Sequence, residues 1–91
     1  MKTSYYHIDY INQLPTFSGI YWLFESSNGI LNLVYLGKSR NIRQRLRDHS
    51  QSKSHRFDFF TYEFYPERKL RKKCYQIINK DSNIYLDTIN N

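Results

Sequence analysis

The sequence predicts an α/β (α+β) sandwich in which a three-stranded, mainly antiparallel sheet is flanked by helices, in the order (α)-β-β-α-β-α. Two alternating apolar runs joined by Asn28-Gly29 predict a hairpin. A helical apolar period begins at Asn41, and a second one follows Pro66. With a further strand between these two helices, the chain has the elements of a small domain with one sheet.

The hairpin is the clearest local signal. Gly19 to Glu25 alternates between two apolar faces, and a second run extends from Ile30 to Leu36. Between them, Asn28-Gly29 favours the positive φ angles that a tight turn needs. The sequence therefore predicts two antiparallel strands joined by a short turn.

The two helices and the third strand follow in order. Asn41 is placed to cap a helix in which Ile42, Arg45, Leu46 and His49 share one face. A guanidinium on such a face needs a partner or a function, which makes Arg45 a candidate site residue. Residues 57–65 alternate as an aromatic strand, and Pro66 is placed to open a second helix. The apolar stripe of that helix comprises Leu70, Cys74, Ile77 and Ile78.

Length and composition indicate one folded domain, residues 1–91, with an N-terminal segment at 1–17 and a core at 18–85. Nine tyrosines and six phenylalanines provide too many large apolar anchors for a disordered polymer. No run is long enough for a membrane span or a signal peptide, and the single Cys74 cannot form an internal disulfide. We therefore expect a cytoplasmic or otherwise intracellular protein with no membrane partner.

Positive charge is concentrated in two segments. Residues 38–56 carry seven cations and one carboxylate, Asp48, a net charge of +6 that equals that of the whole chain. Residues 67–81 add six cations and two carboxylates. Such clustering suits phosphate binding, although a merely solvated basic surface has the same composition.

Three motifs occur in a fixed order: Gly19-Ile20-Tyr21, Tyr35-Leu36-Gly37, and the helix segment from Asn41 to Leu46 with Arg45 in it. Together they resemble the GIY-YIG nuclease superfamily, which includes homing endonucleases and excision-repair nucleases. Asn83 lies near the asparagine that closes the family's domain. The resemblance implies a metal-dependent DNA endonuclease that uses Mg²⁺ or Mn²⁺.

The resemblance also implies a role for each matching residue. Tyr21 is the candidate base, Tyr35 its partner, Arg45 the group that stabilises phosphate charge, and His49 a group that orients or relays protons. A tyrosine pKa near 10 has to be lowered for base duty. Candidates for nucleic-acid binding are the cations Lys38, Arg40, Arg43, Arg47, Lys53 and Lys72.

The metal ligand departs from the family pattern. Anchored on Tyr75, the expected glutamate falls at Lys72, an ammonium that cannot ligate Mg²⁺. Glu67 and Glu63 are the nearby carboxylates. Two hypotheses follow: a nuclease whose cation is held by one of these or by a partner, or a catalytically inactive module that binds DNA or RNA without a cofactor.

The short chain leaves no room for a separate target-recognition domain. DNA rather than RNA is the expected partner. A homo-oligomer or a protein partner is the expected source of any sequence specificity, or of a missing carboxylate.

Overall fold

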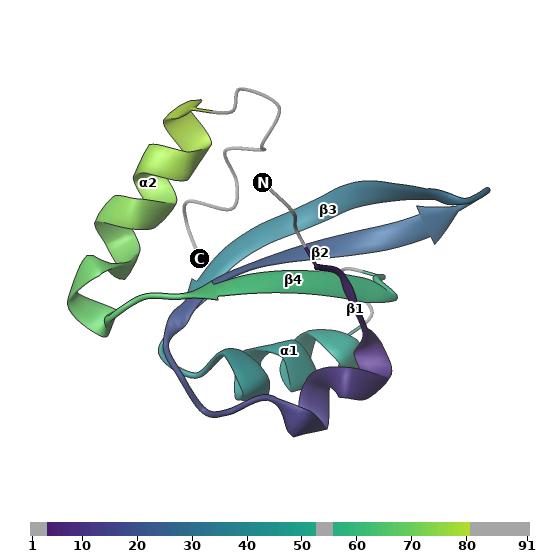
Figure 1. The fold of residues 1–91 in the computed structure, drawn as a ribbon, viewed down its shortest axis with the longest axis horizontal. Coiled ribbons are helices and arrows are strands. Elements are labelled where there is room, and N and C mark those ends of the chain that lie inside the picture. Colours follow the sequence, from purple (N-terminus) through teal and green to yellow (C-terminus); the bar gives the residue numbers. More distant parts are fainter. Residues whose placement is uncertain (1–3, 53–55, 81–91) are drawn as a thin grey trace.

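The computed structural model describes residues 4–52 and 56–80. In chain order the elements are β1 (Tyr6–His7), the 3₁₀ helix η1 (Ile8–Gln13), β2 (Gly19–Ser27), β3 (Ile30–Ser39), α1 (Ile42–Gln51), β4 (Phe59–Phe64), the 3₁₀ helix η2 (Glu67–Lys69) and α2 (Leu70–Lys80). The strands form one antiparallel sheet in the order β1-β4-β2-β3 (Figure 1). The predicted sandwich class is confirmed.

The sheet has four strands rather than the predicted three. The additional strand, β1, pairs Tyr6 with Phe60 and His7 with Phe59. A two-residue strand is too short to show an alternating pattern. It forms because β4 offers a free edge, a property of the assembled sheet rather than of the local sequence.

The β2–β3 hairpin confirms its prediction and is longer than expected. Asn28 and Gly29 have φ angles of 52° and 77°, as a two-residue hairpin turn with positive φ at both positions requires. The ladder continues from Ser27 paired with Ile30 to Gly19 paired with Ser39. Its two strands supply the central surface to which both helices attach.

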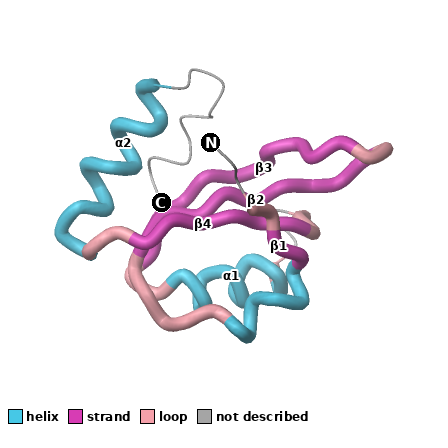
Figure 2. The backbone as a smooth tube through the Cα atoms, viewed as in Figure 1, coloured by secondary structure: helices cyan, strands magenta, loops and turns pink. Residues whose placement is uncertain are grey.

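The helices cover opposite faces of this sheet (Figure 2). On one face, α1 and η1 enclose a core that includes Tyr21, Leu23, Leu46 and Phe60. On the other face α2 packs through the predicted stripe, with Leu70, Cys74 and Ile78 buried and Ile77 partly buried against Ile20 and Leu36. Alternation along β2 therefore sends Tyr21 to the α1 side and Ile20 to the α2 side.

One helix begins where the sequence predicts, and the other begins later. The Asn41 side chain accepts a hydrogen bond from the Gln44 N–H at 3.1 Å, which confirms the predicted cap. The cap of η1 is His7, whose Nδ1 accepts from the Asp9 N–H at 3.2 Å. Pro66 is followed by the turn η2, so α2 itself begins only at Leu70.

Candidate active site

Three aromatic side chains from three elements meet on the α1 face. The Tyr21 hydroxyl on β2 lies 2.9 Å from Nε2 of His49 on α1. The Tyr35 ring on β3 lies 6.0 Å from the Tyr21 ring and 4.8 Å from the His49 ring, centroid to centroid. Tyr21 has no exposed surface and Tyr35 is 7% exposed. The fold thus brings together three of the four predicted catalytic residues.

Gly37 makes room for this cluster. It pairs with Tyr21 across the β2–β3 ladder. A Cβ at Gly37 would lie 2.5 Å from Tyr21 Cζ and 2.7 Å from Tyr35 Cε2, closer than carbon atoms can approach. The glycine of the second motif is therefore required because both tyrosine rings occupy the space that a side chain would fill.

Arg45 is the fourth predicted catalytic residue, and it borders Tyr21. Burial raises the Tyr21 pKa well above its ordinary value, and Tyr35 raises it further, whereas the charge of Arg45 and its hydrogen bond lower it. The net shift is upward, so Tyr21 is a neutral phenol at neutral pH. The expectation that the site lowers this pKa does not hold in this structure.

A cavity of about 540 Å³ opens beside this cluster, between the N-terminal ends of α1 and α2. Arg45 is in its wall, together with three further cations: Lys38, Arg40 and Arg71. Four cations on one concave surface favour the binding of a polyanion. Arg45 belongs both to the cavity wall and to the surroundings of Tyr21, and so connects the two parts of the site.

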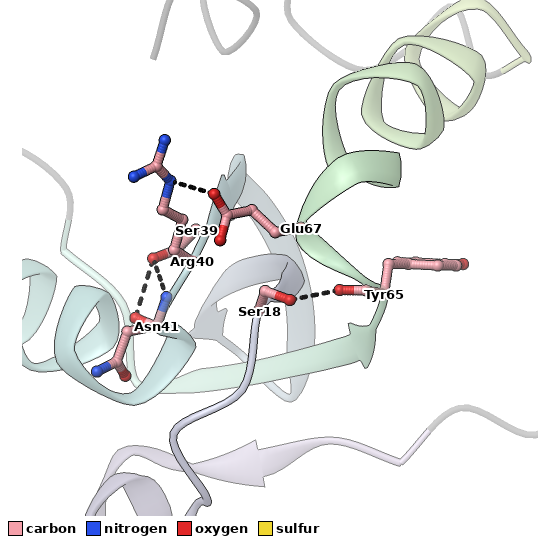
Figure 3. Close-up of polar contacts among 6 residues, drawn as sticks. All are labelled: Ser18, Ser39, Arg40, Asn41, Tyr65 and Glu67. Carbon is pink, nitrogen blue, oxygen red and sulfur yellow. Dashed lines mark hydrogen bonds and ion pairs between the residues drawn. The ribbon is translucent and has the colours of Figure 1, made fainter.

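Two hydrogen bonds between Ser39 and Asn41 stabilise the backbone where β3 meets α1, at the rim of this cavity. The Ser39 hydroxyl donates to the Asn41 carbonyl at 2.9 Å and accepts from the Asn41 N–H at 3.0 Å (Figure 3). Arg40 lies between these two residues, and its side chain is paired with Glu67 of η2. The capped helix start therefore fixes where the cations of this segment emerge.

The two predicted carboxylate candidates lie in different places. Glu67 lines the cavity, and its Oε1 is 2.9 Å from Nε of Arg40 (Figure 3). Glu63 pairs with Ile20, on the α2 face, and accepts a short hydrogen bond from the Tyr65 hydroxyl. Only Glu67 of this pair is placed beside Arg45.

The cavity also contains a carboxylate that was not among the predicted metal ligands. Asp48 lines the wall near Arg45, and its Oδ1 accepts from Gln44 Nε2 at 3.1 Å. The signal was available, because Asp48 follows Arg45 by three residues and so shares its helix face. Within the described ranges there is no group of three or more His, Cys, Asp or Glu side chains placed to hold a metal.

On α2, Lys72 is exposed and does not line the cavity, whereas Arg71 does. A cation therefore stands at the α2 wall, one residue earlier than the sequence suggests. The alignment of Lys72 with the family's glutamate stays a prediction.

The remaining predicted cations are divided between two sides of α1. Lys38 and Arg40 face the cavity. Arg43 Nη1 donates to the Leu14 carbonyl at 3.2 Å and Arg47 Nε donates to Asn12 Oδ1 at 2.8 Å, so both lie against η1 and the loop that follows it. Lys53 and Asn83 lie outside the described residues.

A comparison with known families matches residues 17–86 to the GIY-YIG catalytic domain. The chain belongs to the GIY-YIG family. Membership implies a nuclease-type function with a nucleic acid as substrate, and members of the family typically use divalent metal ions. No curated protein and no solved structure gives a significant match. Of the helices in the described part of the chain, none is long and apolar enough to cross a membrane.

Proposed function

We propose that this GIY-YIG domain binds DNA with a backbone phosphate in the cation-lined cavity and hydrolyses the phosphodiester there. The observation that carries this proposal is the position of Arg45, which joins the cavity to the buried Tyr21–His49 pair. A phosphodiester transition state is anionic, so a fixed guanidinium stabilises it. Lys38 and Arg71 in the same wall bind the neighbouring phosphates of the DNA strand.

In this mechanism Tyr21 transfers a proton rather than acting as a preformed phenolate. Because burial raises its pKa, Tyr21 accepts the proton of the attacking water only as it gives its own to His49 across the 2.9 Å contact. Histidine is suited to this role, since it takes up and releases protons near neutral pH. Tyr21 has no exposed surface, so the attacking water has to approach it from the cavity, at the point where Arg45 borders both.

The carboxylates of the cavity fit a hard divalent cation. Oxygen donors from one or two carboxylates, with the rest of the shell from water and phosphate, are the usual protein ligands of Mg²⁺. Glu67 would hold the ion, with Asp48 in the same wall. The Glu67–Arg40 pair does not prevent this, because both side chains are largely exposed and such pairs are weak. A bound Mg²⁺ or Mn²⁺ would supply charge stabilisation at the leaving oxygen.

The test is nicking of supercoiled plasmid with Mg²⁺ and Mn²⁺ by purified wild type and variants. Arg45→Ala should lower the rate by roughly 10²–10³-fold, the usual effect of removing one preorganised donor to an oxyanion. Glu67→Gln should abolish metal-dependent nicking. Glu63→Gln is the matched control, because Glu63 does not line the cavity, and it should leave the rate unchanged. Cleavage by Arg45→Ala at the wild-type rate would refute the proposal.

A second function is favoured by the excess of cations over carboxylates in the cavity. Four cations face two carboxylates there, and Glu67 is already paired with Arg40. If Arg71 or Lys72 replaces the charge of the metal, the domain binds nucleic acid without cleaving it. Binding would weaken steeply with salt, and nicking would be absent in wild type. Nicking gained by Arg71→Glu or Lys72→Glu would identify the position of the lost ligand.

A carboxylate from a second subunit or a protein partner is the remaining source of a metal ligand. Mixing two inactive variants, Arg45→Ala and Glu67→Gln, tests for it. Recovery of nicking in the mixture indicates a site shared between subunits, and no recovery indicates a site within one chain.

A further inference from the structure

A second hollow, of about 240 Å³, lies beside the cavity and differs from it in chemistry. Its walls are Phe17, Ser18, Phe64, Tyr65 and Pro66. Phe17 and Phe64 are 56% and 42% exposed, and their rings meet edge to face with centroids 5.0 Å apart. The Ser18 hydroxyl is already used, since it donates to the Tyr65 carbonyl at 2.6 Å. The hollow therefore presents mainly aromatic surface to a ligand.

The hollow and the cavity are lined by residues that are neighbours in the chain. Pro66 lines the hollow and Glu67, the next residue, lines the cavity. On the other side, the Phe17 carbonyl accepts from the Ile42 N–H at 2.9 Å, where α1 begins. Figure 3 shows Tyr65 and Glu67 on one continuous stretch of backbone, with the Glu67 side chain directed toward Arg40. A ligand with an anionic part and a planar apolar part could thus occupy both spaces together.

Aromatic rings continue from the hollow along the edge of the sheet. The Phe64 ring is 4.9 Å from that of Tyr62, Tyr62 is 5.5 Å from Tyr6, and Tyr6 is 5.0 Å from Tyr10, centroid to centroid. With Phe17 they form an unbroken aromatic row of five rings, and its last member, Tyr10, is 37% exposed. Tyr6 and Tyr62 are partly buried against the core, whereas Phe17, Phe64 and Tyr10 are exposed. Exposed aromatic rings are surfaces on which unpaired bases stack.

We propose that the hollow and the aromatic row bind unpaired bases of a DNA strand whose phosphate lies in the cavity. The charge of the site favours this ligand, because the cavity wall carries Lys38, Arg40, Arg45 and Arg71. Each nucleotide of a nucleic-acid strand has a phosphate for the cavity and a flat base for the aromatic rings. In a duplex the base faces are covered by their neighbours, so the substrate class is single-stranded DNA or the unpaired strand of a junction. This inference rests on the proposed function.

The experiment measures binding by fluorescence anisotropy of one oligonucleotide as a single strand, as a duplex and as an abasic strand. Wild type should bind the single strand most tightly. Phe17→Ala and Phe64→Ala should each lower single-strand affinity by roughly 5- to 150-fold, the range for loss of one stacked base, and leave duplex binding unchanged. Tyr75→Ala, which removes a 55% exposed ring on α2 outside the row, is the matched control and should bind like wild type.

A second readout reports stacking directly. A strand containing 2-aminopurine should lose fluorescence on binding wild type and keep it on binding Phe17→Ala or Phe64→Ala. Single-strand affinity that is the same in both variants and wild type overturns the inference, as does equal affinity for duplex and single strand. A concentration-dependent dimer that Phe17→Ala dissolves also overturns it, because the hollow is then a contact between two copies.

Failure of the inference and failure of the proposed function give different results. If only the inference is wrong, binding remains steeply salt-dependent and is weakened by Arg45→Ala, but the aromatic variants do not affect it. If the proposed function is wrong, Arg45→Ala binds every probe as wild type does.

Discussion

Replacing Gly37 with alanine tests whether the second motif glycine exists to accommodate the tyrosine pair. The added methyl would lie 2.5 Å from Tyr21 Cζ, 2.7 Å from Tyr35 Cε2 and closer still to the Tyr21 hydroxyl. Both rings are buried, and Tyr21 has no exposed surface into which it can move. We therefore expect Gly37→Ala to displace the Tyr21 ring from its contact with His49.

The magnitude follows from the cost of overpacking a buried site. Inserting one methyl group into a well-packed core costs about 1–3 kcal/mol in the free energy of unfolding. For a domain of 91 residues this lowers the melting temperature by roughly 5–20 °C. Thermal denaturation followed by circular dichroism measures the shift. The imidazole ¹⁵N signals of His49 report the loss of the Tyr21 contact at a temperature where the variant is folded.

Gly29→Ala is the control for Gly37→Ala. Gly29 has a φ of 77° and open space around its Cα, so alanine there costs about 1–2 kcal/mol through backbone strain without touching the site. It should lower the melting temperature and leave the His49 signals unchanged. A Gly37→Ala protein with wild-type melting temperature and unchanged His49 signals would refute the reasoning, because the two rings would then have space that the structure does not show.

Three further predictions concern single side chains. Burial raises the Tyr21 pKa, so above pH 10 the unfolded chain loses a proton that the folded chain keeps. The free energy of unfolding should therefore fall by about 1.4 kcal/mol per pH unit above pH 10. Urea denaturation between pH 9 and 11 measures this dependence, which Tyr21→Phe should flatten. Asn41→Ala should lower the free energy of unfolding by about 1 kcal/mol, because it removes the cap of α1. Asn32→Ala, at an exposed strand position, should lower it much less in the same denaturation assay. The hydrogen bond from Tyr65 to Glu63 raises the pKa of Tyr65 to about 12. In an alkaline titration followed by phenolate absorbance, Glu63→Gln should therefore move one tyrosine transition back toward pH 10. An unchanged titration would contradict the contact between Tyr65 and Glu63.

Local signals accounted for much of the fold and part of the site. Asn28-Gly29 and the Asn41 cap act through their immediate neighbours, which is why their positions could be predicted from sequence. β1 could not be predicted, because its two residues are a strand only where the edge of β4 is present. The separation of Glu67 from Glu63 could not be predicted either, since it depends on how η2 packs beside the start of α1.

The family, the order of the main elements and the residues that gather around Tyr21 could all be predicted from the sequence. These depend on spacing within a strand or a helix, where the period of the backbone sets direction. Contacts between elements far apart in the chain place Arg71 rather than Lys72 at the cavity and bring Asp48 and Glu67 into the same wall. Such contacts also make Tyr21 a buried neutral phenol, because packing in three dimensions sets solvation and thereby pKa.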